Sequence, residues 1–576
     1  MDAAGERRAR ETEIKLLLRR QDVTRLRSHP VLWAGFEQAG EPSQQASVYF
    51  DDRRRTLRRE GLSLRVRQIG ERRIQTIKAL NGSAGPIERG EWQADVAGTR
   101  PDLSAAAGTA LQPVLPKLRN PLEPVFETRV ARTAFPVQYG NSEILVALDQ
   151  GEIDTGKASA PICEVELELK RGNRGDLFRL AEQLDGTIPL ELSYATKSAR
   201  GYALLDAADT NFDRAGDVRL LPGTSLADAF RAIAHDCLRH VVENRAGVAR
   251  REPEALHQMR IAIRRFRTTL SLFRDVVAGP GAEAVKAELR WLRDQTGPAR
   301  DLDVFISEVM VPIRGQHPKE KAVVSLHQHL RRRRLKAYSA AREAVASPRF
   351  RKLAVQTAAW VEDGDWRTNA DALMQARQDA PVEIYAAERL SALHRKVRKH
   401  GKRLREFDHE GRHRLRVQAK KLRYAAEFLA RLAPARKARK RAKALIAALK
   451  QMQDKLGGLN DIAVRKSLSA EIAGKVGPGA ARKQSGRERI FVAGLIAGHQ
   501  EAHMGRLLDE AADAFAEFRK VKPFWKALAR ESVPVPASPG KPPEAEAAAP
   551  VAPASGAEHA RAEDGARVQE AESKAA

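Results

Sequence analysis

The feature that most constrains the fold is a change in hydrophobic periodicity near residue 225. Up to about residue 207, short apolar–polar alternations recur between residues rich in Gly, Pro and Asn, which is the pattern of an antiparallel sheet or barrel. From about residue 225 the spacing becomes that of long helices rich in Leu, Ala, Arg and Lys. The last part of the chain is rich in Pro, Ala and Glu with almost no large apolar residues, a composition typical of disorder. We therefore predict a strand-rich domain at 1–210, a linker at 211–224, a helical domain at 225–530 and a disordered tail at 531–576.

The predicted strands carry charges of both signs on one face. In the stretch ETEIKLLL, Glu11, Glu13 and Lys15 point one way and Ile14 points the other, because strand side chains alternate between faces. A solvated outer face would explain any one such strand. Seven or eight of them, each with an apolar and a charged face, suggest a closed barrel with a polar lumen. The other charges on these faces are Arg65, Arg67, Lys78, Glu91, Arg132, Asp149, Glu164, Glu166, Glu168 and Lys197.

Such a lumen would have a definite chemistry. Carboxylates from several strands can lie close together only if they are protonated or compensated by a cation. Ligation by oxygen alone suits Mg²⁺ or Mn²⁺, and neighbouring arginines and lysines suit the oxygens of a phosphate chain. A metal-bound water could then attack a terminal phosphoryl group. The residues alone leave both this site and a solvated barrel face open.

Several motifs resemble the CYTH superfamily, the triphosphate tunnel metalloenzymes. They are Glu11-x-Glu13-x-Lys15, YFDDRRRTLRREGLSLRVR (49–67), T-x-K (76–78), R-x-E (89–91), ALDQGEI (147–153), CEVELEL (163–169) and residues 196–202. The resemblance implies an eight-stranded antiparallel tunnel in which acidic residues bind a divalent metal and basic residues hold triphosphate. The chain departs from the family pattern at Asp52 and Arg53, where Thr-Pro is common. Arg129 sits off the face of Arg132 and is given no role.

The resemblance also implies individual roles. Lys15, Lys78 and Lys197 are predicted to be catalytic. Arg65, Arg67 and Arg132 are predicted to contact the substrate. The predicted ligands for Mg²⁺ or Mn²⁺ are Glu11, Glu13, Asp149, Glu164, Glu166 and Glu168.

The helical part contains an internal duplication. The stretch HQMRIAIRRFRTTLSLF (257–273) aligns without gaps with HRLRVQAKKLRYAAEFL (413–429), and GPARDLDV (297–304) pairs with GGLNDIAV (457–464). Each long copy has a histidine and then basic residues three, seven and ten positions later, which share one helical face. We predict two related helical bundles whose basic ladders bind an anion. The ladder residues are His257, Arg260, Arg264, Arg267, His413, Arg416, Lys420 and Arg423.

The charge of the chain indicates a polyanionic partner. Lys and Arg number 101 against 74 Asp and Glu, for a formal net charge of +27, which favours nucleic acid, an anionic membrane or a phosphate polymer. Aromatic residues make up only 5% of the chain, which argues against base stacking and hence nucleic acid. A phosphate polymer requires only charge. Since histidine has an ordinary pKa of about 6.5, we expect His257 and His413 to add attraction as the pH falls toward about 6.

The H-x-x-R helices and the G-x-x-R-D element resemble the CHAD domain (conserved histidine α-helical domain) over about residues 225–530. The element is formed by Gly297, Arg300 and Asp301, and the second copy has Asn460 in place of the arginine. The resemblance implies the helical fold and long-chain polyphosphate as a partner.

These observations predict metal-dependent hydrolysis of inorganic tripolyphosphate in the tunnel, with polyphosphate binding by the helical domain. The alternatives are a non-catalytic polyphosphate-binding or granule-associated protein, and an adenylate cyclase of the CYTH type. Cys163 and Cys237 lie in different predicted domains, which fits a reducing compartment. With no apolar signal or membrane-spanning segment, we expect a cytoplasmic protein without a membrane partner. The oligomeric state and the preferred metal stay open.

Overall fold

A computed structural model describes residues 9–79, 87–206, 212–216, 218–433, 435–474, 494 and 504–528. The side chains of residues 9–11, 88–89 and 460–474 are outside this description, and so are those of Glu11 and Asn460. The predicted tail at 531–576 also lies outside it.

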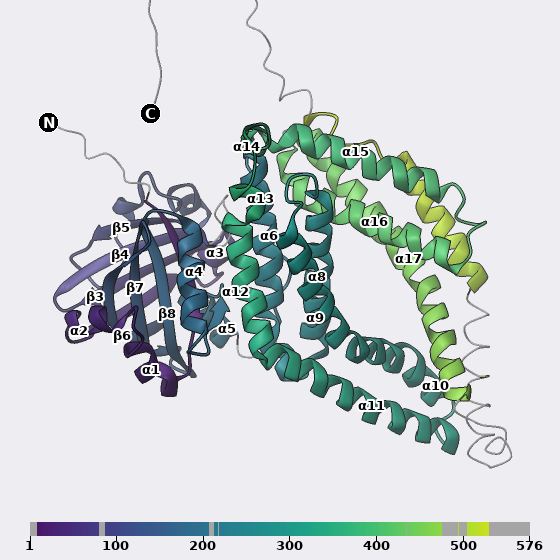
Figure 1. The fold of residues 1–576 in the computed structure, drawn as a ribbon, viewed down its shortest axis with the longest axis horizontal. Helices are drawn as coiled ribbons and strands as arrows, with labels where there is room; N and C mark the ends of the chain where they lie inside the picture. The colour runs from purple at the N-terminus through teal and green to yellow at the C-terminus, as the bar shows by residue number, and fades with distance from the viewer. Residues whose placement is uncertain are drawn as a thin grey trace, which may run out of the picture. The chain divides into compact units, whose positions relative to one another are not determined.

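The N-terminal part of the chain folds as a closed antiparallel barrel (Figure 1). Hydrogen-bonded neighbours follow the order β5-β4-β3-β2-β6-β7-β8-β1, and pairing between β5 and β1 closes the ring. A ninth strand, β9, adds to the last residues of β1. The predicted eight-stranded antiparallel barrel is thereby confirmed. The strands are β1 (Ala9–Leu17), β2 (Ser43–Asp51), β3 (Leu62–Ile69), β4 (Arg72–Ala79), β5 (Glu88–Asp95), β6 (Glu123–Tyr139), β7 (Ser142–Asp154), β8 (Ser159–Arg171) and β9 (Glu191–Ser193).

Strand β1 changes partner along its length. Residues 9–12 pair with β5, whereas residues 13–17 pair with β8. Within the second part, residues 15–17 also pair with β9. The barrel therefore closes at the first strand of the chain.

The alternation of the strands separates an apolar outside from a charged inside. Ile14, Val146 and Leu167 are almost fully buried, in the same apolar cluster as Leu177 and Phe178 of helix α4 (Arg174–Asp185). Because neighbouring side chains on a strand point to opposite faces, the charged residues between them point into the barrel. The remaining helices of this half are α1 (Val23–Arg27), α2 (Trp33–Gln38), α3 (Thr56–Arg59) and α5 (Lys197–Leu205).

The C-terminal part is helical, as predicted. Prolines occupy the first turn of several of its helices and Ser225 and Asp408 cap two of them, as expected at helix N-termini. The described helices include none that is long and apolar enough to cross a bilayer. They are α6 (Leu226–Glu243), α7 (Arg245–Ala249), α8 (Pro253–Leu272), α9 (Pro280–Phe305), α10 (Val311–Gln316), α11 (Lys321–Ala346), α12 (Pro348–Asp363), α13 (Asp365–Thr368), α14 (Ala372–Asp379), α15 (Val382–Gly401), α16 (His409–Leu429) and α17 (Arg436–Gly474).

The helix boundaries reproduce the sequence duplication. Helices α6, α8 and α9 begin at residues 226, 253 and 280, and α15, α16 and α17 begin at residues 382, 409 and 436. Each start in the second set follows its counterpart by the same 156 residues. Three helices of each copy therefore correspond, and the basic ladders lie on the corresponding pair α8 and α16.

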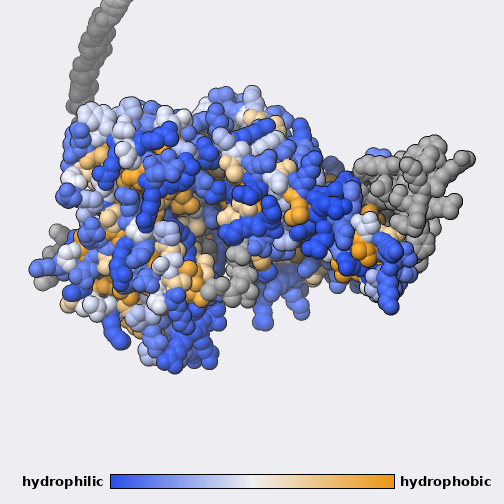
Figure 2. Space-filling model, turned by 90° about the horizontal axis from the view of Figure 1, so that it is seen from below, coloured by the Kyte–Doolittle hydropathy of each residue, from blue (hydrophilic) through white to orange (hydrophobic). Residues whose placement is uncertain are grey.

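The barrel and the helical part share one apolar core. Helix α4 and strand β9 pack against α12 and α6, and Leu184 and Leu192 of the barrel belong to the same buried cluster as Ile233 and Val355 of the helices. The visible face in Figure 2 is largely hydrophilic, with apolar residues in small groups. Burial of apolar surface thus joins the two halves.

Candidate active site and basic ladders

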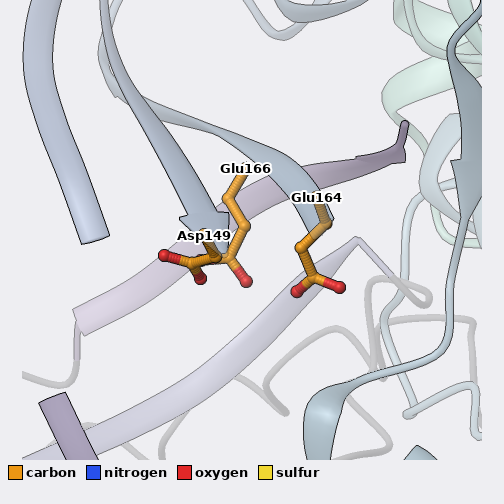
Figure 3. A group of neighbouring side chains, drawn as sticks. All are labelled: Asp149, Glu164 and Glu166. Atoms are coloured by element: carbon orange, nitrogen blue, oxygen red, sulfur yellow. The ribbon is translucent and has the colours of Figure 1, made fainter. Parts of the chain in front are cut away.

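Three carboxylates meet inside the barrel. Asp149 on β7 and Glu164 and Glu166 on β8 each place a carboxylate oxygen within 4.8 Å of the others, and Figure 3 shows the three groups gathered together. Asp149 and Glu164 are fully buried. Register explains the meeting, because Asp149 is the direct cross-strand partner of Glu164.

Lys197 is the cation that joins these carboxylates. Its Nζ lies 2.6 Å from Asp149, 2.6 Å from Glu164 and 2.9 Å from Glu166. The lysine is the first residue of α5, which Thr196 caps by accepting a hydrogen bond from the Ala199 amide. Burial alone would lower the pKa of Lys197, but the three carboxylates hold its pKa well above the usual value. The ammonium group therefore stays charged.

Glu166 receives two further cations. Lys15 Nζ lies 2.5 Å from Glu166 and 2.8 Å from Glu13, and Arg132 donates to Glu166 and to both oxygens of Asp149. Burial would raise the pKa of Glu166, yet the surrounding lysines and arginine hold that pKa well below its usual range. The carboxylate is therefore ionised although it is buried.

Arg200 is a site residue that the sequence reasoning missed. It donates to Glu164 Oε2 at 2.8 Å and to the backbone oxygen of Pro161. It lies three residues after Lys197 on α5, and residues at that spacing share a helix face. This spacing is the sequence feature that could have indicated Arg200 as a site residue.

A second group of basic residues comes from strands β3 and β4. Arg65 donates to the Tyr49 hydroxyl at 3.4 Å, and Lys78 Nζ lies 2.7 Å from Glu91. Arg67 is half-buried, two residues beyond Arg65 on the same strand. These residues add positive charge to the barrel interior.

Two other predicted metal ligands, Glu13 and Glu168, are not part of the three-carboxylate cluster. Glu13 is buried and shares Lys15 with Glu166. Glu168 pairs with Lys170, 2.6 Å away, and Glu11 lies outside the described side chains. The structure thus gathers Asp149, Glu164 and Glu166, and Lys15 connects Glu13 to Glu166.

The donor set fits a hard divalent cation. The cluster offers only carboxylate oxygens, which Mg²⁺ and Mn²⁺ prefer. Arg65 in addition has a buried Nε with no hydrogen-bond partner among the described residues. A buried donor without a partner is costly, and an anion beside the cation would satisfy it.

The first basic ladder lies on α8 and faces arginines of α9. Arg260 donates to the backbone oxygen of Arg293 at 3.1 Å. Burial lowers the pKa of Arg260, Asp301 opposes this and neighbouring arginines reinforce it. Burial and two arginines of α9 likewise lower the pKa of Arg267. Positive charge on this surface is therefore only partly compensated.

The second ladder lies on α16 and faces α17. Arg423 donates to Gln453 at 2.9 Å, and His413 is exposed. Burial lowers the pKa of Lys421, and nearby Arg267 lowers it further. Arg267 of the first ladder therefore lies near Lys421 of α16, where α8 packs against α16.

The surroundings of His257 disfavour its protonation near pH 6 in the free protein, while the expected gain in attraction for an anion at lower pH stays a prediction. Burial lowers the pKa of His257 to about 4, and the cations of Arg300, Arg264 and Arg260 contribute while Glu254 opposes. The arginines that make the ladder attractive to an anion also repel a proton. His257 is neutral at pH 6 until an anion compensates those charges.

A closed eight-stranded barrel with carboxylates and basic residues inside, followed by a duplicated helical domain with basic ladders, defines a two-domain class. Residues 9–202 match the model of the CYTH domain, and residues 232–470 match that of the CHAD domain. The chain therefore contains one region that matches the CYTH domain and a second that matches the CHAD domain.

Similar proteins include an inorganic triphosphatase of Haemophilus influenzae, which is 34% identical over 160 residues. The match covers 27% of this chain and 45% of the relative, so this chain spans less than half of the relative's length. The CHAD domain of the plant Ricinus communis is 26% identical, with a TM-score of 0.46, over 55% of this chain and 98% of that one. A Hippeastrum protein described as an adenylyl cyclase with a dominant triphosphatase activity is 16% identical, with a TM-score of 0.24, over 34% and 95%.

Proposed function

We propose that the barrel hydrolyses inorganic tripolyphosphate with the help of Mg²⁺ or Mn²⁺. The observation that carries the proposal is the surroundings of Glu166, a buried carboxylate that lies beside two others and contacts Lys15, Lys197 and Arg132. Clustered carboxylates suit a divalent cation, and the basic residues around them suit a phosphate chain. The similarity to an inorganic triphosphatase supports the same substrate class.

The residues would divide the work as follows. Asp149, Glu164 and Glu166 would hold the cation, which when bound neutralises phosphate charge and lowers the pKa of a water molecule. Arg65 and Arg132 would bind phosphate oxygens and align the chain for in-line attack. As the water oxygen bonds to the terminal phosphorus, the bridging P–O bond breaks, the proton lost by the water passes to phosphate oxygens or to solvent, and phosphate and pyrophosphate leave. Lys197 would stabilise charge on the transferred group and would not accept a proton, because its pKa is well above the usual value.

The proposal is tested by phosphate release from tripolyphosphate, ATP and thiamine triphosphate, each with Mg²⁺ or Mn²⁺. We expect tripolyphosphate to be the best substrate and release to cease without divalent metal. Cyclic AMP formed from ATP at a comparable rate would instead support the cyclase alternative. No release from any of the three would support a polyphosphate-binding or granule-associated protein.

We further propose that the helical domain binds long-chain polyphosphate along the ladders of α8 and α16. The supporting observation is that burial first, and neighbouring cations second, lower the pKa of Arg260 and Arg267 on the ladder of α8 and of Lys421 beside the ladder of α16. Cations that repel each other are stabilised by a polyanion. Removal of Arg260, Arg264, Arg416 and Lys420 together should weaken binding and flatten its dependence on salt. The matched control removes four exposed charges of α11, at Arg331, Arg332, Lys336 and Arg342.

Competition separates polyphosphate from nucleic acid. Both ligands would show salt dependence through counterion release. Single-stranded RNA should displace polyphosphate only in large excess, measured per phosphate group. Displacement at equal phosphate concentration would identify a general nucleic-acid binder.

A further inference from the structure

A carboxylate of the helical domain holds the last strand of the barrel. Glu243 is the final residue of α6, and its Oε1 accepts hydrogen bonds from the backbone amides of Tyr194 at 2.7 Å and Ala195 at 3.2 Å. It also accepts from the Ser193 hydroxyl at 3.2 Å. One oxygen of the helical domain thus fixes three consecutive residues of the barrel domain.

These three residues lie between the two lysines of the candidate site. Ser193 ends β9, where it is the direct cross-strand partner of Lys15. After Ala195 the chain reaches Thr196, the cap of α5, and then Lys197. The position at which Lys197 enters the barrel therefore depends on the direction of the chain at residues 193–195.

Other contacts from the helical domain hold the same segment. Arg245 of α7 forms an ion pair with Glu191, at the start of β9. The Tyr194 hydroxyl contacts His235 Nδ1 at 3.1 Å, and Glu362 lies 2.7 Å from Nε2 of the same buried histidine. The segment from β9 to α5 is therefore attached to α6, α7 and α12.

We propose that Glu243 is a positioning residue for Lys197, so that the helical domain completes the phosphate site of the barrel. This inference depends on the function proposed above for the barrel. Without the Glu243 carboxylate, the Tyr194 amide loses a strong acceptor in a partly buried place and the Ala195 amide is left with the Ser193 hydroxyl. The chain would turn so that the Tyr194 amide reaches another acceptor. A displacement of about 1 Å in a site residue can cost about 100-fold in rate.

A double-mutant cycle tests the inference in the full-length protein. Tripolyphosphate binding is measured by calorimetry without divalent metal, so that no turnover occurs. We expect Glu243→Ala to weaken binding about tenfold in the otherwise unchanged protein and less than about twofold in a Lys197→Ala background, because coupled residues are not additive. Glu243→Gln keeps an acceptor oxygen and should restore most of the affinity. Equal weakening in both backgrounds, or none, would overturn the inference.

Two further measurements separate this inference from the proposed function. Asp363→Ala is the matched control, because it removes another hydrogen bond between the same two domains, in which Asn173 donates to Asp363 at 2.9 Å. This variant should leave binding unchanged. Hydrogen exchange of residues 193–200 should become faster in Glu243→Ala and not in Asp363→Ala. If the unchanged protein releases no phosphate from tripolyphosphate with Mg²⁺ or Mn²⁺, the proposed function fails. Unchanged exchange in Glu243→Ala would overturn the positioning role whatever the ligand is.

Discussion

The guanidinium group of Arg260 lies against Gly297, so that a β-carbon on this glycine would be 3.3 Å from Nη1. Arg416 lies against Gly457 in the same way, also at 3.3 Å. Each glycine belongs to the helix that follows its arginine, α9 in the first copy and α17 in the second. The two copies thus share a contact in which glycine makes room for a ladder arginine.

Gly297→Ala should therefore separate stability from anion binding. Alanine favours a helix over glycine by up to about 1 kcal/mol, but a β-carbon directly before Pro298 is disfavoured in a helix, so we expect the melting temperature to change little. The new methyl group would displace the flexible end of Arg260 and weaken polyphosphate binding about threefold, the scale of a surface ion pair of up to about 1 kcal/mol. Gly315→Ala is the control, because no heavy atom lies within 4 Å of its added β-carbon. Unchanged affinity in Gly297→Ala would count against the role of Arg260.

Arg132 and Arg129 provide a matched pair on β6. Arg132→Ala removes a partly buried partner of Asp149 and Glu166 and should lower the rate of phosphate release by about 100-fold or more, as loss of a charge-stabilising donor does elsewhere. Arg129→Ala removes contacts with Glu127 and Glu152 and should change the rate less than about twofold, since exposed ion pairs contribute little. Both rates are measured at saturating tripolyphosphate. Similar losses in the two variants would remove the evidence for a lumen role of Arg132.

Glu166→Gln should abolish most turnover while the barrel stays folded. Glutamine keeps the size of the side chain and removes the charge that three cations contact. We expect phosphate release to fall by at least about 100-fold and the circular dichroism spectrum to stay unchanged. Glu152→Gln, on a side chain that is 46% exposed, serves as the control. Near-normal turnover in Glu166→Gln would exclude the carboxylate from the reaction.

Polyphosphate binding should take up protons at mildly acidic pH. The pKa of His257 is lowered to about 4 in the free protein, and a bound polyanion would raise it by compensating the surrounding arginines. Between pH 4 and the higher pKa of the complex, the bound form holds more protons, so affinity should rise as the pH falls from 7 to 5. Calorimetry at pH 5.5 in two buffers of different ionisation enthalpy measures this uptake. His257→Gln should reduce it, and equal heats in both buffers would contradict the role of His257.

The same linkage predicts acid sensitivity of the helical domain. Burial lowers the pKa of both His240 and His394 to about 4, below the ordinary value of about 6.5. The unfolded chain therefore binds more protons between pH 4 and 6.5, and the free energy of unfolding should fall as the pH decreases through this window. Thermal unfolding between pH 7 and 4.5 should show a decline of several degrees. Asn or Gln at both positions should make that decline smaller.

Alternation along the strands was sufficient to predict which residues face the lumen, because it depends only on local geometry. It could not predict depth along the barrel. Glu164, Glu166 and Glu168 share a face, yet two residues of strand advance about 6.6 Å, so the last of them pairs with Lys170 outside the cluster. In the helical part, the spacing of residues in the sequence was sufficient to predict the basic ladders and the duplication. Three pairs of helix starts in the structure show the same duplication.

Contacts between distant segments were beyond the sequence pattern. Glu243 appears there as the end of an amphipathic helix, and nothing in its neighbourhood indicates a bond to residues 193–195, about fifty positions earlier. The pKa of His257 was likewise beyond prediction, since it depends on Arg300 of the next helix. Local periodicity determines faces, whereas packing determines which faces meet.

The closure of the barrel at β1 determines the order in which the protein can fold during its synthesis. The ribosome makes β1 before the strands with which residues 13–17 pair, β8 and β9, which end at residues 171 and 193. At a synthesis rate of about 5–20 residues per second, roughly ten to thirty seconds pass between the synthesis of Glu13 and Lys15 and that of these partner strands. Strands β2 to β7 can form hairpins in the meantime, each with its neighbour in the chain or in the sheet. Since Glu243 emerges later still, a nascent chain can contain the barrel before it contains the hydrogen bonds of Glu243 to residues 193–195.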